Sequence, residues 1–219
     1  MLDEKMVDIK RELTEYSILV RSMIERSIEG LLKKQRQGLL DIIERDEPRA
    51  NEWEITLDEL CIQTIAQFAP RAKDLRTILM ALRINNDLER MGDHAANIAD
   101  DALFLIERPQ VKPLIDIPRM AEEAVHMVRD SLFSFFHEDS ALAKSVGARD
   151  NIVDTCAEQS LRELITYMSA DPTIVERGLR LLNIARNIER IADLSTNIAE
   201  DVIFMVEGRL IKHNRVEHE

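Results

Sequence analysis

Acidic residues recur at a four-residue spacing in two stretches of the sequence, LERMGDHAANIADD at 88–101 and IERIADLSTNIAED at 188–201. On an α-helix this spacing places side chains on one face, each a turn above the next, where like charges repel. The recurring positions are Glu89, Asp93, Asn97 and Asp101 in the first stretch and Glu189, Asp193, Asn197 and Asp201 in the second. A solvated acidic face is the simplest interpretation, but duplication of the whole pattern favours a functional role.

More acidic residues lie at a matching depth on the helix that precedes each stretch. Both helices of an antiparallel hairpin rise about 1.5 Å per residue, so residues equally far from the turn face each other. The residues at the matching depth are Glu47 and Asn51 in the first half of the chain and Asp150 and Asp154 in the second. Glu54 and Asp58 also lie four residues apart, but they are closer to the turn, and we expect them to be surface charges.

Four carboxylates held close together repel unless they are protonated or share a cation. Sites built only from oxygen ligands suit hard cations such as Mg, Mn, Ca or iron. The predicted metal ligands are therefore Glu47, Asn51, Glu89, Asp93, Asp150, Asp154, Glu189 and Asp193, with Asn97, Asp101, Asn197 and Asp201 as weaker candidates. The second half offers four level carboxylates and the first offers three and an amide. We therefore expect the second site to bind metal more tightly.

A carboxylate-bridged enzyme of the di-iron type is a competing hypothesis. Helical di-iron proteins carry a histidine three residues after a glutamate ligand, and this histidine is missing after Glu89 and Glu189. His94 lies beside Asp93, but its counterpart in the second stretch is Leu194, so we expect His94 not to be a ligand. A helical adaptor that binds no metal is the third hypothesis.

The composition and periodicity predict an all-α fold. Hydrophobic residues make up 45% of the chain, aromatics only 4%, and Gly and Pro number six each, which disfavours a β-sandwich. Apolar residues recur every three or four positions over six long stretches, at 3–36, 37–68, 71–107, 116–136, 138–169 and 172–207, with Pro48 restarting the second helix. Leu79–Glu107 recurs at Leu179–Glu207 without a gap. We therefore expect two tandem, internally duplicated three-helix bundles, at 1–108 and 109–208, and a polar tail at 209–219.

Charge and cysteine usage exclude several classes of protein. The net charge of -12 provides no basic surface for nucleic acid. No stretch supplies the roughly 20 apolar residues of a membrane span, and the N-terminus has no signal-peptide pattern. Cys61 and Cys156 are far apart, which is typical of core thiols in a reducing cytoplasm. Motifs for phosphate loops, zinc sites and nucleophile elbows are absent.

The sequence resembles the PhoU family over nearly its whole length. The most specific segments are LERMGDHAANI at 88–98, IERIADLSTNI at 188–198, DLR at 74–76 and YMSADP at 167–172. The resemblance implies two three-helix bundles with acidic E/D-x-x-x-D motifs that bind metals, including iron clusters in some members. These motifs match Glu89/Asp93, Glu189/Asp193 and Asp150/Asp154, whereas the segment from Glu47 ends in the amide of Asn51. The second bundle also has Ile-Ala-Asp where Ile-Gly-Asp is usual.

The same resemblance implies a regulator rather than an enzyme. Members of the family that this sequence resembles restrain phosphate uptake and dampen the phosphate-starvation response. They link the phosphate ABC transporter, through its ATPase subunit, to a phosphate sensor histidine kinase. The resemblance further implies a cytoplasmic homodimer that is at most peripheral to the membrane, with multinuclear iron clusters or other divalent cations as cofactors.

Overall fold

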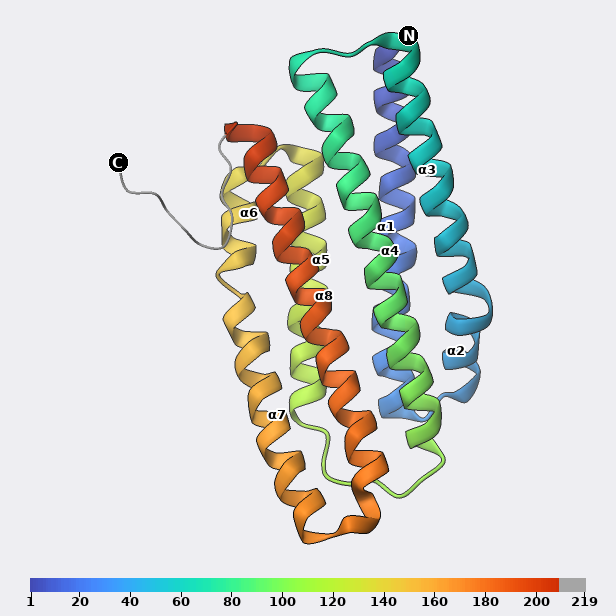
Figure 1. Cartoon of the computed structure of the whole chain (residues 1–219), viewed down its shortest axis with the longest axis vertical. Helices are drawn as coiled ribbons and strands as arrows, with labels where there is room; N and C mark the ends of the chain where they lie inside the picture. Colours follow the sequence, from blue (N-terminus) through green and yellow to red (C-terminus); the bar gives the residue numbers. More distant parts are fainter. Residues whose placement is uncertain (209–219) are drawn as a thin grey trace, which may run out of the picture.

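The computed structural model describes residues 1–208, which form two bundles of helices lying side by side (Figure 1). The first bundle consists of α1 (Leu2–Lys33), α2 (Arg36–Asp41), a π-helix (Ile42–Asp46), α3 (Glu47–Phe68) and α4 (Ala72–Ile106). The second consists of α5 (Asp116–His137), α6 (Ser140–Gly147), α7 (Asp150–Ala170), a 3-10 turn (Pro172–Ile174) and α8 (Val175–Glu207). Residues 1–208 contain no strand, and the predicted class of two tandem three-helix bundles is confirmed.

The connection between the bundles runs from 107 to 115 and contains the predicted boundary at 108/109. The exact domain limits remain a prediction, and the predicted tail at 209–219 lies outside the described residues. None of the helices in 1–208 combines the length and apolarity needed to cross a membrane.

Helices α4 and α8 form most of the contact between the two bundles and run antiparallel, and α1 also packs against α5 (Figure 1). Their inner faces are apolar at helical spacing, so that Ile84, Leu88, Ile184 and Ile188 are completely buried. Burial of such faces, rather than intrinsic helix propensity, supplies most of the stability of helices in a bundle. The two acidic stretches of the sequence therefore lie on the two central helices. α4 also packs against α3, and α8 against α7.

The cysteines are core residues, as predicted. Cys61 on α3 and Cys156 on α7 are both buried and free. Burial and, to a smaller extent, the nearby Asp58 raise the pKa of the Cys61 thiol to about 12. A thiol held in its protonated form is a poor nucleophile and a poor metal ligand.

Two helix boundaries differ from the sequence prediction. The predicted single helix over 138–169 is wrong: the left-handed Glu138 ends α5, and the segment that follows forms two helices, α6 and α7, with a break at 148–149. In the first bundle the π-helix comes immediately before Pro48. A proline lacks the N–H donor and its ring crowds the carbonyl four residues earlier. A wider π-turn accommodates both effects without ending the helix.

Candidate metal centre

The first cluster of acidic side chains lies between α3 and α4. Asn51 Nδ2 donates a hydrogen bond to Glu47 Oε1 at 3.0 Å, which joins the two α3 residues. Burial raises the pKa of Glu89 on α4, and Asp93, Glu54 and Glu47 raise it further. The pKa of Asp93 is raised by burial and by Glu47. Glu47 of α3 therefore acts electrostatically on Glu89 and Asp93 of α4 across the hairpin, and the meeting of all four side chains at one level stays a prediction.

Glu54 belongs to this cluster too, and the expectation that it is a surface charge was wrong. Its side chain is half-buried, and its pKa is raised by burial, by Asp58 and by Asp93. Asp58 is half-buried as well and accepts a hydrogen bond from the buried Asn85 Nδ2 at 2.8 Å. Three residues of helix span only about 4.5 Å. A glutamate side chain bridges that distance, which the comparison of backbone depth ignored.

The second cluster lies between α7 and α8. Burial, and after it the neighbouring Asp154, Asp193 and Glu189, together raise the pKa of Asp150 to about 6. Asp154 and Glu189 also have raised pKa values, caused first by burial and then by the neighbouring carboxylates. Asp150 Oδ1 is buried and has no hydrogen-bond partner. The cluster opens into a cavity of about 450 Å³ that Asp150 and Asp193 help to line.

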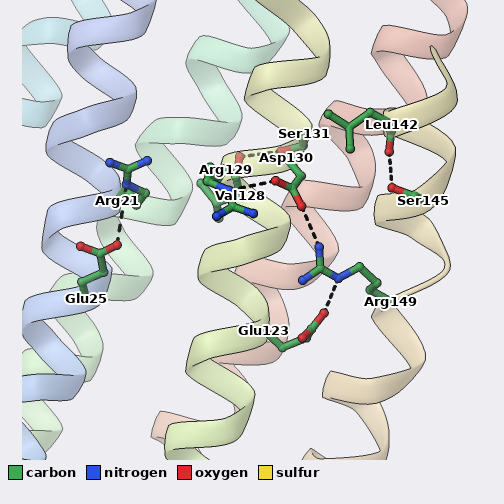
Figure 2. A network of polar contacts seen from close by, with 10 residues as sticks. All are labelled: Arg21, Glu25, Glu123, Val128, Arg129, Asp130, Ser131, Leu142, Ser145 and Arg149. Carbon is green, nitrogen blue, oxygen red and sulfur yellow. Dashed lines mark hydrogen bonds and ion pairs between the residues drawn. The ribbon is translucent and has the colours of Figure 1, made fainter. Parts of the chain in front are cut away.

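An ion pair fixes the first turn of the helix that carries Asp150 (Figure 2). Arg149, the residue before it, donates from Nη1 to Asp130 Oδ2 of α5 at 2.8 Å, and its Nε pairs with Glu123. In the first bundle Asp46, the residue before Glu47, pairs in the same way with Arg26 of α1. Each cluster is thereby positioned by an ion pair to the first helix of its bundle.

The donor set fits a hard cation, because all the groups are oxygen ligands and their mutual repulsion raises their pKa values. The unpartnered Asp150 Oδ1 is an oxygen that a cation would satisfy. Within residues 1–208, however, no three His, Cys, Asp or Glu side chains converge closely enough to hold a metal ion. Metal ligation by the two clusters therefore stays a prediction.

Of the weaker candidates for metal ligation, the two aspartates form ion pairs and the two asparagines are exposed. Arg180 Nη1 of α8 donates to Asp101 Oδ1 of α4 at 2.7 Å, and Arg83 of α4 pairs with Asp201 of α8. These two aspartates therefore connect the bundles. Asn97 is exposed on α4, and Asn197 is an exposed residue at the edge of the 450 Å³ cavity.

His94 also lies at the contact between the bundles. Its Nδ1 is 2.8 Å from Asn187 Oδ1 of α8. Burial lowers the pKa of His94, the bond to Asn187 raises it, and Arg90 and Arg190 lower it again. This environment explains His94 as a contact between helices, which agrees with the expectation that it is not a ligand.

Tyr16 lies on the buried face of α1. It is completely buried, but its hydroxyl oxygen has no hydrogen-bond partner. Its ring stacks on Trp53 with centroids 6.0 Å apart.

A duplicated all-α bundle with one carboxylate cluster in each half is thus the class of protein that fold and site define. The PhoU domain family model matches residues 13–102 and 117–202, one match in each bundle. The chain therefore belongs to the PhoU family. A "Phosphate-specific transport system accessory protein PhoU homolog" from Aquifex aeolicus is 37% identical over 216 residues, covering 99% of this chain and 97% of the relative. A homolog from Pseudomonas aeruginosa is 32% identical, covering 94% of this chain and 85% of the relative.

Solved structures give the same result. The crystal structure of PhoU from Pseudomonas aeruginosa superposes with a TM-score of 0.92 at 30% identity, covering 95% of this chain and 100% of the other. A phosphate transport system regulatory protein PhoU from Streptococcus pneumoniae has a TM-score of 0.88 at 24% identity, which supports the fold alone. The family is one of accessory proteins, so the prediction that the chain is not an enzyme is confirmed and the di-iron enzyme hypothesis falls.

Proposed function

We propose that this chain is a cytoplasmic, metal-binding regulator of phosphate uptake and a negative regulator of the phosphate-starvation response. One observation carries the proposal: the family match covers both bundles, and relatives similar over almost the whole chain are named accessory proteins of phosphate-specific transport. In this proposal the chain acts as a homodimer. It binds the ATPase subunit of the phosphate ABC transporter and the phosphate sensor histidine kinase.

The output of such a regulator is a change in partner binding. A protein can transmit phosphate status only if its affinity differs between two states of the transporter or kinase, since equal affinity shifts neither state. The net charge of -12 favours association with basic surfaces on those partners. It also supports the absence of nucleic acid among them.

Metal would act on the carboxylate clusters. In the first bundle the ligands would come from Glu47, Asn51, Glu54, Glu89 and Asp93, and in the second from Asp150, Asp154, Glu189 and Asp193. A bound cation, whether an iron cluster or another divalent ion, would neutralise the repulsion that raises the pKa values of these groups. It would thereby join α3 to α4 and α7 to α8.

Deletion and complementation test the regulatory function. We expect a deletion strain to take up phosphate and express starvation genes in phosphate-rich medium, and the wild-type chain to restore repression. Glu189→Gln combined with Asp193→Asn is expected to fail to restore it. The control, Glu52→Gln with Glu59→Gln, removes two exposed charges of α3 and should complement fully. Normal uptake and gene expression in the deletion strain would refute the regulatory function.

A metal-free helical adaptor is the second candidate. It is favoured by the finding that no three ligand side chains converge within the described part of the chain. Elemental analysis of protein purified without added metal separates the two candidates. Metal bound in the wild type and lost in the Glu189→Gln, Asp193→Asn variant supports the first, and a metal-free protein that still represses uptake supports the second.

A further inference from the structure

Two cavities lie next to each other where α1 ends and α5 begins, in the lower part of Figure 1. The larger, of about 350 Å³, lies between the two helices and has Ile28 and Val125 in its lining. The smaller, of about 200 Å³, lies between the end of α1 and the connection that joins the bundles, and Val111 and Leu114 help to line it. Leu32 lines both cavities and is 44% exposed. Together they form an apolar groove with an exposed leucine at its centre, which we call the α1/α5 groove.

The two ends of the α1/α5 groove carry opposite charges. The larger cavity is lined by three carboxylates and two basic side chains, namely Glu25, Glu29, Glu122, Lys33 and His126. The smaller cavity is lined by Lys34 and Arg108, and no acidic residue of 1–208 lines it. From Glu25 to Lys34 the chain rises about 14 Å. An acidic end and a basic end therefore lie on either side of Leu32.

The carboxylates at the acidic end are available to a partner. Glu25 pairs with Arg21 at 3.7 Å, and Glu29 pairs with Lys33, but the side chains of both pairs are exposed. Exposed ion pairs of this kind contribute at most about 1 kcal/mol and often nothing measurable. A basic side chain from a partner can therefore replace them at little cost.

The charges and the concave shape together select one kind of occupant. An anionic membrane surface or a nucleic acid would be repelled by the three glutamates at the acidic end. A second copy of this chain would bring another concave groove, and two concave surfaces leave space between them unfilled. A helix is convex and fits lengthwise between two packed helices. In this mode of recognition the apolar side chains along one face of the helix enter the groove.

We propose that the α1/α5 groove binds one amphipathic helix of a protein partner, with apolar side chains around Leu32 and opposite charges at its two ends. The inference rests on the proposed regulatory function, in which the chain acts by binding the transporter and the kinase. The basic end of the helix lies against the glutamates, and its acidic end lies against Lys34 and Arg108. This arrangement also fixes the direction of the bound helix, because the reversed helix would bring like charges together.

The first test is binding of the full-length chain to the purified transporter with its ATPase subunit and to the purified kinase, measured by surface plasmon resonance. Leu32→Gln keeps a good helix former at an exposed position. It should weaken binding to one of the two proteins at least about thirtyfold, since apolar anchors at the centre of an interface dominate affinity. The matched control is Ile62→Gln, which changes a 59% exposed residue of α3 outside the groove and should bind as the wild type does. Equal affinities of Leu32→Gln and the wild type would overturn the proposal.

The second test reverses the charges at each end. Glu25→Lys with Glu122→Lys should weaken binding about tenfold, and so should Lys34→Glu with Arg108→Glu. The control, Glu52→Lys with Glu59→Lys, reverses two exposed charges of α3 and should have no such effect. A loss for one groove variant and a gain for the other would indicate a partner of uniform charge and overturn the proposal.

Oligomeric state and circular dichroism of the same variants complete the experiment. A dimeric wild type that becomes monomeric in Leu32→Gln, with its helix content unchanged, would assign the groove to a second copy and overturn the proposal. A wild type that binds its partner with an affinity that no groove variant changes would overturn the docking site and leave the regulatory function intact. A wild type that binds neither protein would also overturn the docking site, and the deletion strain decides separately on the regulatory function.

Discussion

In the first bundle, Arg26 of α1 pairs with Asp46 at the entrance to α3. In the second, the charges are exchanged: Arg149 at the entrance to α7 pairs with Asp130 of α5. The two halves of the duplication thus keep an ion pair at the same place while reversing its sense. What the fold requires is a fixed first turn in front of each acidic cluster, and either arrangement of the charges provides it.

The contact between the second and third long helices differs between the two bundles in the polar residues that form it. In the first bundle Asn85 donates to the Glu54 carbonyl and to the Asp58 side chain, both at 2.8 Å. One repeat later the position of Asn85 is occupied by Ala185, and Ala157 matches Glu54. The first bundle is therefore more polar at this contact and has one carboxylate more than its ligand motif suggests. A count of motif residues alone hides this difference between the bundles.

The largest effect is expected where the bundles meet. Asp101 is 7% exposed in its side chain, whereas Asp201 is 15% exposed. Arg180→Ala leaves the more deeply buried Asp101 without its main cation and should lower the free energy of unfolding by about 3 kcal/mol. Arg83→Ala, the matched change on α4, should cost about 1 kcal/mol. Urea denaturation measures both, and equal losses would show that the two pairs are equivalent.

The next largest difference is expected between Gly30 of the first bundle and Gly178 of the second, because an added Cβ would meet different neighbours. A Cβ at Gly30 of α1 would lie 2.5 Å from Leu39 Cδ2, in a fully buried side chain. Gly30→Ala should therefore cost about 2 kcal/mol through overpacking. A Cβ at Gly178 of α8 would meet the Met168 sulfur at 2.6 Å. This flexible, half-buried side chain can move, so Gly178→Ala should cost less than about 1 kcal/mol. A larger loss of melting temperature for Gly178→Ala would contradict this.

Substitution of Glu54, the additional carboxylate of the first cluster, tests how the metal affinities of the two clusters compare. Counting motif residues predicted tighter binding in the second cluster, but Glu54 gives the first cluster four carboxylates as well. In an Asp193→Asn background, Glu54→Gln should weaken binding of Mn²⁺ to the first cluster at least about tenfold. Isothermal titration measures this, with the exposed Glu59→Gln as control. An unchanged affinity would show that Glu54 is a surface charge. The second cluster would then again be expected to bind metal more tightly than the first.

The smallest effect concerns pH. Burial raises the pKa of Asp87 from 3.8 to about 6, against the lowering effect of Arg90, while Asp201 raises it and Arg83 lowers it. Because the folded chain binds this proton more tightly than the unfolded chain, ionised Asp87 destabilises the fold above about pH 6. The second bundle has Asn187 here. With chelator present, Asp87→Asn should gain about 1 kcal/mol at about pH 7.5.

That gain should shrink as the pH falls through 6 and vanish below about pH 3, where Asp87 is protonated in both the folded and the unfolded chain. Thermal unfolding of the variant and the wild type across this range is the measurement. A gain that is the same at every pH would assign the effect to packing instead of ionisation.

The helices themselves could be predicted because apolar spacing directly encodes which face is buried. The interruption at 148–149, where α6 ends and α7 begins, was not predicted from this spacing. Within the clusters, the positions of Asp150 and Asp193 followed from depth alone, because helical rise is constant. Glu54 was misplaced by the same rule, because the reach of a side chain adds to the position of its backbone.

The sequence by itself determined the all-α class, the duplication, the family and the acidic residues that face each other inside each hairpin. All of these depend on periodicity or on neighbours along the chain. Only the tertiary structure decided that Asp101 and Asp201 bind arginines of the opposite bundle. It alone showed that Tyr16 of α1 stacks on Trp53 of α3. These contacts join helices distant in sequence, and their partners depend on the rotation of each helix in the packed bundle, which no local pattern encodes.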